Sequence, residues 1–199
     1  EGLEILKELV RIDTVNPPGN ELVLLRAVAA RLEREGIGAE VVEFVPGRGA
    51  LRSVLRASGG ESDDQAPRGV SSGGAGAIVI LAHVDTVGID RAGWSVDPLA
   101  ATEKNGVLYG RGAIDDKGMA AAAIETLLIL KRSGRPLSRD LVLVLEGDEE
   151  AGGRLGIDWI LSNRPEWLRS AAGCLNEGGR VIAGEDGRVR WIGLQTTEK

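Results

Sequence analysis

The stretch AIVILAHVDT, residues 77–86, joins an unbroken apolar run to the only histidine in the chain. Strands that are apolar on both faces belong in the middle of a sheet that helices cover on each side. The run Leu141–Leu145 has the same character, and an Ala-, Ile- and Leu-rich segment separates the two. We expect this segment to form a helix over residues 116–133 that ends at Gly134. The alternation predicts an α/β fold, a three-layer α/β/α sandwich with a mostly parallel central sheet.

Shorter patterns extend this core in both directions. Apolar residues at helical spacing predict two helices before the first strand, and alternation predicts a pair of strands between them and residue 77. The Gly-, Ser- and Asp-rich residues 58–76 predict a solvated loop. The expected elements are helices at 2–12, 20–35 and 156–161, strands at 39–45 and 53–57, and a third short buried strand at 171–175.

Composition limits the classes of function. A chain of 199 residues fits one domain or a little more, with a real core. Its net charge is −6, and the absence of a basic stripe argues against a nucleic-acid partner. No apolar run approaches the ~18 residues of a membrane span, so no membrane partner is expected.

The single cysteine, Cys174, bears on the compartment. It cannot form an internal disulfide, which favours a cytoplasmic location. A removed secretory leader stays an open alternative, because the chain begins at Glu1 without a methionine. We expect Cys174 to be a buried small hydrophobe, the alternative being a reactive thiol.

Polar side chains follow the expected strands at the point where each strand ends. In an open α/β sheet, ligands bind just beyond the carboxyl ends of the strands. His83, the pair Glu149-Glu150 and Glu177 all fall there. Alternate residues of extended chain face one side, so Asp85 can reach the far ring nitrogen of His83 and orient it toward a metal.

Each acidic cluster also has a simpler interpretation. Asp115-Asp116 opens a helix, and helix capping explains one of the two, although the flanking glycines indicate a tight turn around a buried group. The run at residues 146–150 is either a solvated acidic turn or a set of charges that cations neutralise. Asn176-Glu177 is a plain turn when taken in isolation.

Four such clusters at four strand ends favour a shared site. One histidine with several carboxylates suits a divalent ion such as zinc, manganese or cobalt. Two such ions about 3.5–4 Å apart produce a hydroxide at neutral pH and polarise a carbonyl. The sequence therefore predicts two divalent metal ions, with zinc preferred.

These segments resemble the co-catalytic zinc exopeptidase and deacylase family. Its members include acetylornithine deacetylase, succinyl-diaminopimelate desuccinylase, aminoacylase and glutamate carboxypeptidase. The resemblance runs in the family's order along most of the chain and implies a zinc-peptidase-like fold. The stretches that match are residues 81–87, Trp94 with Asp97-Pro98, residues 108–118, residues 146–153 and residues 176–179.

The resemblance also implies a role for each site residue. His83 and Glu177 would bind the first metal, and Glu150 the second. Asp115 would bridge both, through a cis peptide to Asp116. The remaining two roles are catalytic: Glu149 would be the general base that takes a proton from water and passes it to the leaving nitrogen, and Asp85 would orient the histidine.

One feature departs from the family pattern. The family's second metal needs another histidine, and this chain has only His83. We therefore expect residues 1–199 to be the N-terminal portion of a metal-binding catalytic domain, with the lid domain and the C-terminal remainder absent. The segment alone would be inactive or nearly so, and a full-length parent would dimerise through the missing lid.

The resulting hypothesis is a metal-dependent hydrolase that cleaves a peptide or N-acyl amide bond next to a free carboxylate, as in a carboxypeptidase or aminoacylase. A small peptide or N-acyl amino acid would be the substrate. One alternative is an N-deacylase of the acetylornithine or succinyl-diaminopimelate type. Another is a non-catalytic binding module with the same fold, although such a module has no need of the base Glu149. A nucleotide-binding domain is disfavoured, because no Gly-rich phosphate loop follows the first strands.

Overall fold

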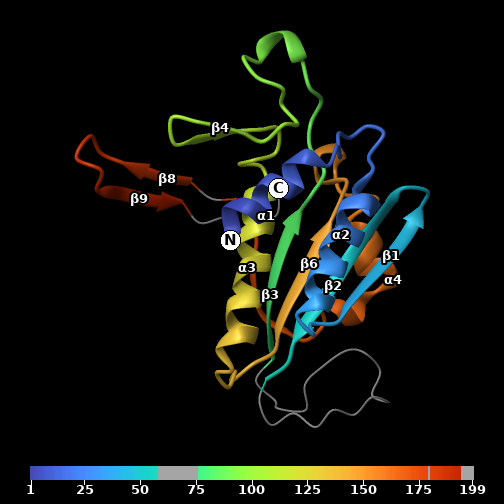
Figure 1. The fold of residues 1–199 in the computed structure, drawn as a ribbon. Helices are drawn as coiled ribbons and strands as arrows, with labels where there is room; N and C mark the ends of the chain where they lie inside the picture. The colour runs from blue at the N-terminus through green and yellow to red at the C-terminus, as the bar shows by residue number, and fades with distance from the viewer. Residues whose placement is uncertain (58–75, 179, 194–199) are drawn as a thin grey trace.

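A five-stranded mixed sheet forms the centre of the protein. The computed structural model describes residues 1–57, 76–178 and 180–193 (Figure 1). Neighbouring strands β6, β3 and β7 are parallel, whereas β2 is antiparallel to both of its neighbours, β1 and β6. Strand β2 is therefore the one strand of this sheet that runs against the others, and the prediction of a mostly parallel sheet is confirmed. In sheet order the strands are β1 (Ala39–Val45), β2 (Arg48–Leu55), β6 (Leu141–Glu146), β3 (Ala77–His83) and β7 (Ala171–Leu175).

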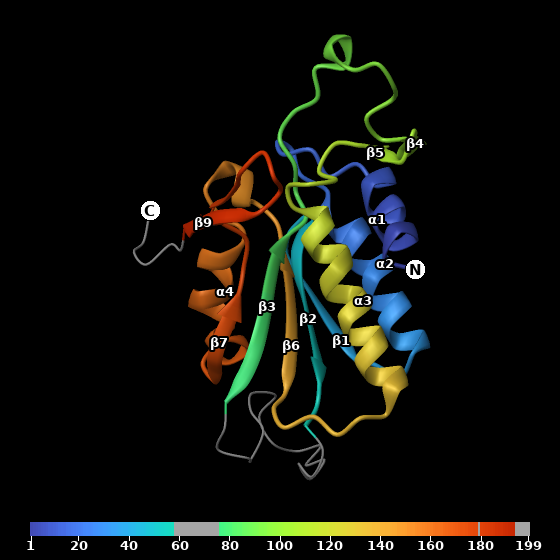
Figure 2. The same ribbon diagram turned by 90° about the vertical axis from the view of Figure 1, so that its left-hand side faces the viewer.

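Helices cover both faces of the sheet. Three of them, α1 (Gly2–Arg11), α2 (Glu21–Arg34) and α3 (Lys117–Ser133), lie on one face, and α4 (Ile157–Asn163) lies on the other (Figure 2). The arrangement confirms the three-layer α/β/α sandwich. None of the helices in the described ranges has the length and apolar character that crossing a bilayer requires.

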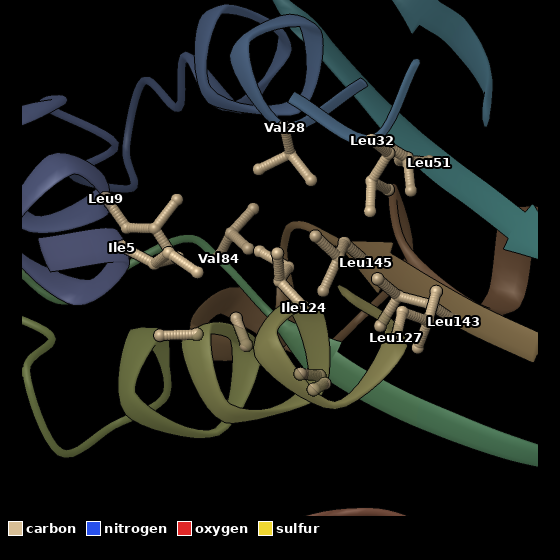
Figure 3. Packing of buried hydrophobic residues seen from close by; sticks show 14 of the residues in the cluster. Ile5, Leu9, Val28, Leu32, Leu51, Val84, Ile124, Leu127, Leu143 and Leu145 are labelled. Carbon is tan, nitrogen blue, oxygen red and sulfur yellow. The ribbon is translucent and has the colours of Figure 1, made fainter. Parts of the chain in front are cut away.

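Alternate residues of the central strands feed two separate cores. Leu143 and Leu145 of β6 point toward α1, α2 and α3, whereas Val142 and Val144 pack on the α4 side with Trp167. Figure 3 shows the larger core, in which side chains of the three helices meet those of β2 and β6. Because β3 and β6 are apolar on both faces, they can be buried only in the middle of such a sandwich.

Two neighbouring residues of α3, one buried and one exposed, allow a direct test of this packing. We expect Leu128→Ala to lower the free energy of unfolding by about 2–5 kcal/mol, because it leaves a cavity at a side chain that is 0% exposed. Ile129→Ala, one residue along at 56% exposure, is the control and should change it by about 0.5 kcal/mol or less. Urea unfolding measures both. Equal effects would show that α3 is rotated relative to this packing.

Most predicted elements have the expected positions. The helices at 2–12, 20–35, 116–133 and 156–161 correspond to α1 to α4, and Gly134 ends α3 in the left-handed conformation (φ 62°). The strand predicted at 53–57 is wrong at both ends: β2 runs from Arg48 to Leu55, and a tight turn before Arg48 pairs it with β1. Apart from residue 76, the loop predicted at 58–76 lies outside the described residues.

The strand predicted at 171–175 exists as β7, but it is exposed rather than buried. Strand β7 pairs with β3 alone among the described strands and so forms an edge of the sheet. Cys174 is accordingly exposed, and the expectation of a buried small hydrophobe is wrong. The elements that sequence patterns did not predict are hairpins β4–β5 (Thr102–Lys104, Val107–Tyr109) and β8–β9 (Arg180–Ala183, Val189–Gly193), and the short 3-10 helices η1 (Arg91–Gly93), η2 (Glu149–Ala151) and η3 (Pro165–Trp167).

Candidate metal centre

The parallel strands bring their carboxyl ends to one edge of the sheet, and the candidate residues follow those ends. His83 is the last residue of β3 and is in register with Glu146, the last residue of β6. Glu149 and Glu150 open η2 directly after β6, and Glu177 follows β7. The topology therefore gathers segments that lie far apart in the sequence.

The imidazole of His83 is the centre of the cluster. Its Nε2 lies 2.9 Å from Asp115 Oδ1 and 3.7 Å from Glu177 Oε2. The ring is 1% exposed, whereas the Asp115 side chain is 64% exposed. One ligand is thus fixed inside the protein, and the carboxylate opposite it faces the accessible side of the site.

Two overlapping groups of side chains have the spacing of metal ligands. One consists of His83, Glu149 and Glu177, and the other of His83, Asp115 and Glu150; within each group the ligand atoms lie within 4.8 Å of one another. Ligand atoms around one zinc ion at about 2.1 Å lie at most about 4.2 Å apart, so the spacing is close to that of a coordination shell. The donor set of one imidazole and several carboxylates fits a divalent cation.

Asp85 fixes the orientation of the imidazole. It is fully buried, and its Oδ1 lies 3.3 Å from His83 Nδ1, which leaves Nε2 for the cluster. Burial favours the neutral acid, but hydrogen bonds from His83 and Asn16 outweigh it and hold the pKa of Asp85 below its ordinary value. Asp85 also accepts hydrogen bonds from the backbone N–H groups of Glu149 (3.2 Å) and Glu150 (3.3 Å). One carboxylate thus positions both the histidine and the acidic turn.

The surroundings of His83 strongly favour positive charge. Burial opposes protonation of the ring, yet hydrogen bonds with Asp85 and Asp115 and the charge of Glu177 raise the pKa of His83 to about 10. The potential that holds a proton there would equally hold a divalent cation, which then displaces the proton. The electrostatic environment of His83 therefore fits a bound metal, as does the spacing of the ligand atoms.

The turn before α3 has the unusual backbone that the resemblance implies. The Asp115–Asp116 peptide bond is cis. Asp116 stands at the N-cap position of α3, yet its side chain makes no capping hydrogen bond, so capping does not explain this acid. Its Oδ2 is buried without a hydrogen-bond partner, and burial raises the pKa of Asp116 to about 7.

Several polar residues near the cluster were not predicted as part of a site. Asn16 donates from Nδ2 to Asp85 Oδ2 (2.9 Å) and to Asp148 Oδ1 (3.2 Å). Lys117 is buried and donates to the carbonyl of Ile12 (2.8 Å), and burial lowers the pKa of Lys117 to about 8. No sequence pattern points to Asn16, because its two partners lie 69 and 132 positions away along the chain.

Glu146 is a further buried acid and gives a pH-dependence prediction. Burial raises the pKa of Glu146 from its ordinary 4.5 to about 8, so between these values the folded chain keeps a proton that the unfolded chain releases. The stability of the metal-free protein should therefore fall as the pH rises from about 4.5 to about 8, by up to about 1.4 kcal/mol per pH unit from this group. Urea unfolding at several pH values should show a shallower slope for Glu146→Gln. Parallel slopes for the two proteins would contradict the prediction.

Sequence comparisons relate this chain to known proteins. A family model described as peptidase family M20/M25/M40 matches residues 79–188, more than half of the chain. The chain is 37% identical to acetylornithine deacetylase of Myxococcus xanthus over 147 residues, which are 74% of this chain and 34% of the relative. It is 30% identical to aminoacylase-1 of Sus scrofa over 179 residues, which are 89% of this chain and 40% of the relative. The chain thus spans well under half the length of these relatives.

Solved structures with the same fold include two peptidases. Human carnosine dipeptidase 1 matches with a TM-score of 0.69 at 24% identity, over 88% of this chain and 38% of that one. The metallo-carboxypeptidase Sso-CP2 of Sulfolobus solfataricus matches with a TM-score of 0.69 at 23% identity, over 94% of this chain and 39% of that one. At these identities the likeness shows the fold. With the family match across β3 to β8, it follows that this chain belongs to peptidase family M20/M25/M40.

Proposed function

We propose that this chain supplies the metal-binding half-site of a hydrolase that cleaves a peptide or N-acyl amide bond next to a free carboxylate. The observation that supports the proposal most directly is the convergence of one buried imidazole with carboxylates from three separate segments of the chain. Two divalent ions, with zinc preferred, would lower the pKa of a water and polarise the substrate carbonyl.

The side chains suit distinct tasks in such a reaction. In this proposal His83, Asp115 and Glu177 would hold the first ion, Asp115 and Glu150 would hold the second, and Asp85 would keep the imidazole in its binding tautomer. Glu149 accepts a proton from the attacking water and delivers it to the leaving nitrogen. Its backbone N–H is tied to Asp85, so the base and the histidine share one anchor.

Residues 1–199 are, in this proposal, the N-terminal portion of a metal-binding catalytic domain. The relatives named above are more than twice as long as the part this chain matches. A second histidine for the metal held by Glu150 would come from the remainder, together with the lid through which the complete protein dimerises. The cytoplasmic location remains a prediction from the single cysteine.

A second candidate has its own support. The relative with 37% identity is an acetylornithine deacetylase, which favours N-deacylation of a small metabolite over cleavage of dipeptides. Both reactions hydrolyse an amide, and the residues of this half-site do not distinguish their substrates. The choice therefore needs a substrate panel.

The test is a metal and activity assay on the complete protein that contains this segment. Elemental analysis should find about two divalent ions per chain, and a panel of N-acetyl amino acids, N-acetylornithine and dipeptides should contain a substrate. Dialysis against a chelator should abolish turnover, and zinc should restore it. Amidated versions of the same substrates are the control for the free carboxylate. Turnover that survives removal of all metal would overturn the proposal, and stoichiometric metal without turnover on the panel would favour the binding module.

A further inference from the structure

Three buried charged residues beside the cluster have no role in the function proposed above. Arg48, the first residue of β2, donates from Nε to Glu21 Oε2 (3.1 Å) and from Nη2 to Glu21 Oε1 (2.6 Å). Its remaining nitrogen, Nη1, lies 3.0 Å from Asp148 Oδ1. All three residues are buried, and Glu21 is completely inaccessible. One planar guanidinium therefore joins the start of α2 to the turn after β6.

Asp148 connects this ion pair to the reacting groups. It immediately precedes Glu149 and has a left-handed backbone (φ 71°). Its Oδ2 accepts a hydrogen bond from the backbone of Leu155 (2.8 Å), and its Oδ1 accepts from Asn16 Nδ2 (3.2 Å). The side chain of Asp148, the residue before η2, is thus hydrogen-bonded to Leu155, which follows η2.

Asn16 links Asp148 to Asp85 through hydrogen bonds. Its one amide nitrogen donates both to Asp148 and to Asp85. Asp85 in turn accepts from the backbone N–H groups of Glu149 and Glu150. The turn that presents the two glutamates is therefore held on one side by Asp85 and on the other by Asp148 with Arg48.

Glycines allow the ion pair to lie directly against backbone. A Cβ at Gly19 would lie 2.5 Å from Arg48 Nε, and a Cβ at Gly147 would lie 2.6 Å from the Glu21 carboxyl group. The ion pair is thus in close contact with the loop that contains Asn16 and with the turn that contains Glu149. Any shift of the pair would move one or the other segment.

We propose that Arg48, Glu21 and Asp148 form a positioning unit that sets the place of Glu149 relative to His83. The inference rests on the proposed function, in which Glu149 is the base. These residues touch neither the metals nor the substrate in this proposal; they act through the backbone of η2 and through Asn16. Residues that orient groups of a metal site in this way typically change activity by about 10–100-fold when removed.

The test separates positioning from stability. The double variant Arg48→Met/Glu21→Gln removes the guanidinium together with the carboxylate that it binds through two hydrogen bonds, because removing Arg48 alone would leave both Glu21 and Asp148 without their cation. In the double variant Asp148 keeps the hydrogen bonds from Asn16 and Leu155. Asp148→Asn preserves the shape of the side chain, removes its charge and replaces one of its two acceptor oxygens by an NH2 donor. The matched control is Arg26→Met/Glu43→Gln, an exposed ion pair at 3.5 Å that also joins α2 to a strand. Leu128→Ala is the control for lost stability without any contact to the unit.

In the complete protein, both variants should lower kcat by about 10–100-fold at 25 °C, with KM and metal content within about twofold of wild type. The two control variants should keep wild-type kcat, even though Leu128→Ala unfolds at a lower temperature. Unchanged kcat in Arg48→Met/Glu21→Gln and Asp148→Asn, in a protein whose wild type is active, would overturn this inference alone. A wild type without metal-dependent turnover would overturn the proposed function and this inference with it.

Discussion

We expect Glu149→Gln to reduce the turnover of the complete protein by about 10²–10⁴-fold while both metal ions stay bound. Glutamine has the same shape but cannot accept the proton of the attacking water. The backbone N–H of Glu149 would still donate to Asp85, so the turn should keep its conformation. The measurements are kcat on the best substrate and metal content by elemental analysis.

Metal content decides between two roles for this side chain. Glu149 has ligand spacing to His83 and Glu177, so the geometry alone also allows it to bind an ion. A general base predicts lost turnover with full metal content, whereas a ligand predicts that metal is lost together with turnover. Glu33→Gln on the exposed side of α2 is the control and should change neither quantity. Full turnover in Glu149→Gln would exclude it from both roles.

The sequence predicted the sheet well because its central strands are buried on both faces. Continuous apolar runs of the kind found at β3 and β6 are compatible with few other environments, and their order along the chain nearly fixed the architecture. The error at β7 has the same origin. The apolar and small residues of 171–175 predicted burial, but burial depends on what packs against a strand, and β7 lies at an edge of the described sheet.

The candidate site was predictable only in part, for a physical reason. His83, Glu149 and Glu177 could be found because each follows a strand end, where topology brings ligands together. Asn16 could not, since the contact that explains it joins positions 132 apart in the sequence. Arg48 stands at the start of a strand with a turn before it, where arginine is ordinarily solvated, and only the fold shows that it is buried against Glu21.

Asp115→Asn should have an effect of comparable size on turnover and a larger one on metal binding. In the proposed site Asp115 is the one side chain shared by both ions, so a neutral amide would weaken both. Several kcal/mol of lost charge stabilisation corresponds to roughly a 10³-fold loss of turnover, and we expect metal content to fall below that of wild type under the same dialysis.

The exposure of Asp115 makes this the cleanest variant for the shared ligand. The side chain of Asp115 is 64% exposed, so its replacement leaves the core untouched. The side chain of His83 is 1% exposed, so its replacement would also disturb the packing around it. The thermal midpoint of the metal-free protein should therefore fall by only a few degrees in Asp115→Asn, since the variant weakens the 2.9 Å contact with His83 but removes no buried packing. Loss of the folded state would point to a structural role instead. Asp158→Asn, an exposed acid in the first turn of α4, controls for the loss of one negative charge at a helix start. Retained metal with retained turnover in Asp115→Asn would mean that the acidic turn before α3 is not part of the site, because no other described carboxylate lies as close to Nε2 of His83 as the 2.9 Å of Asp115.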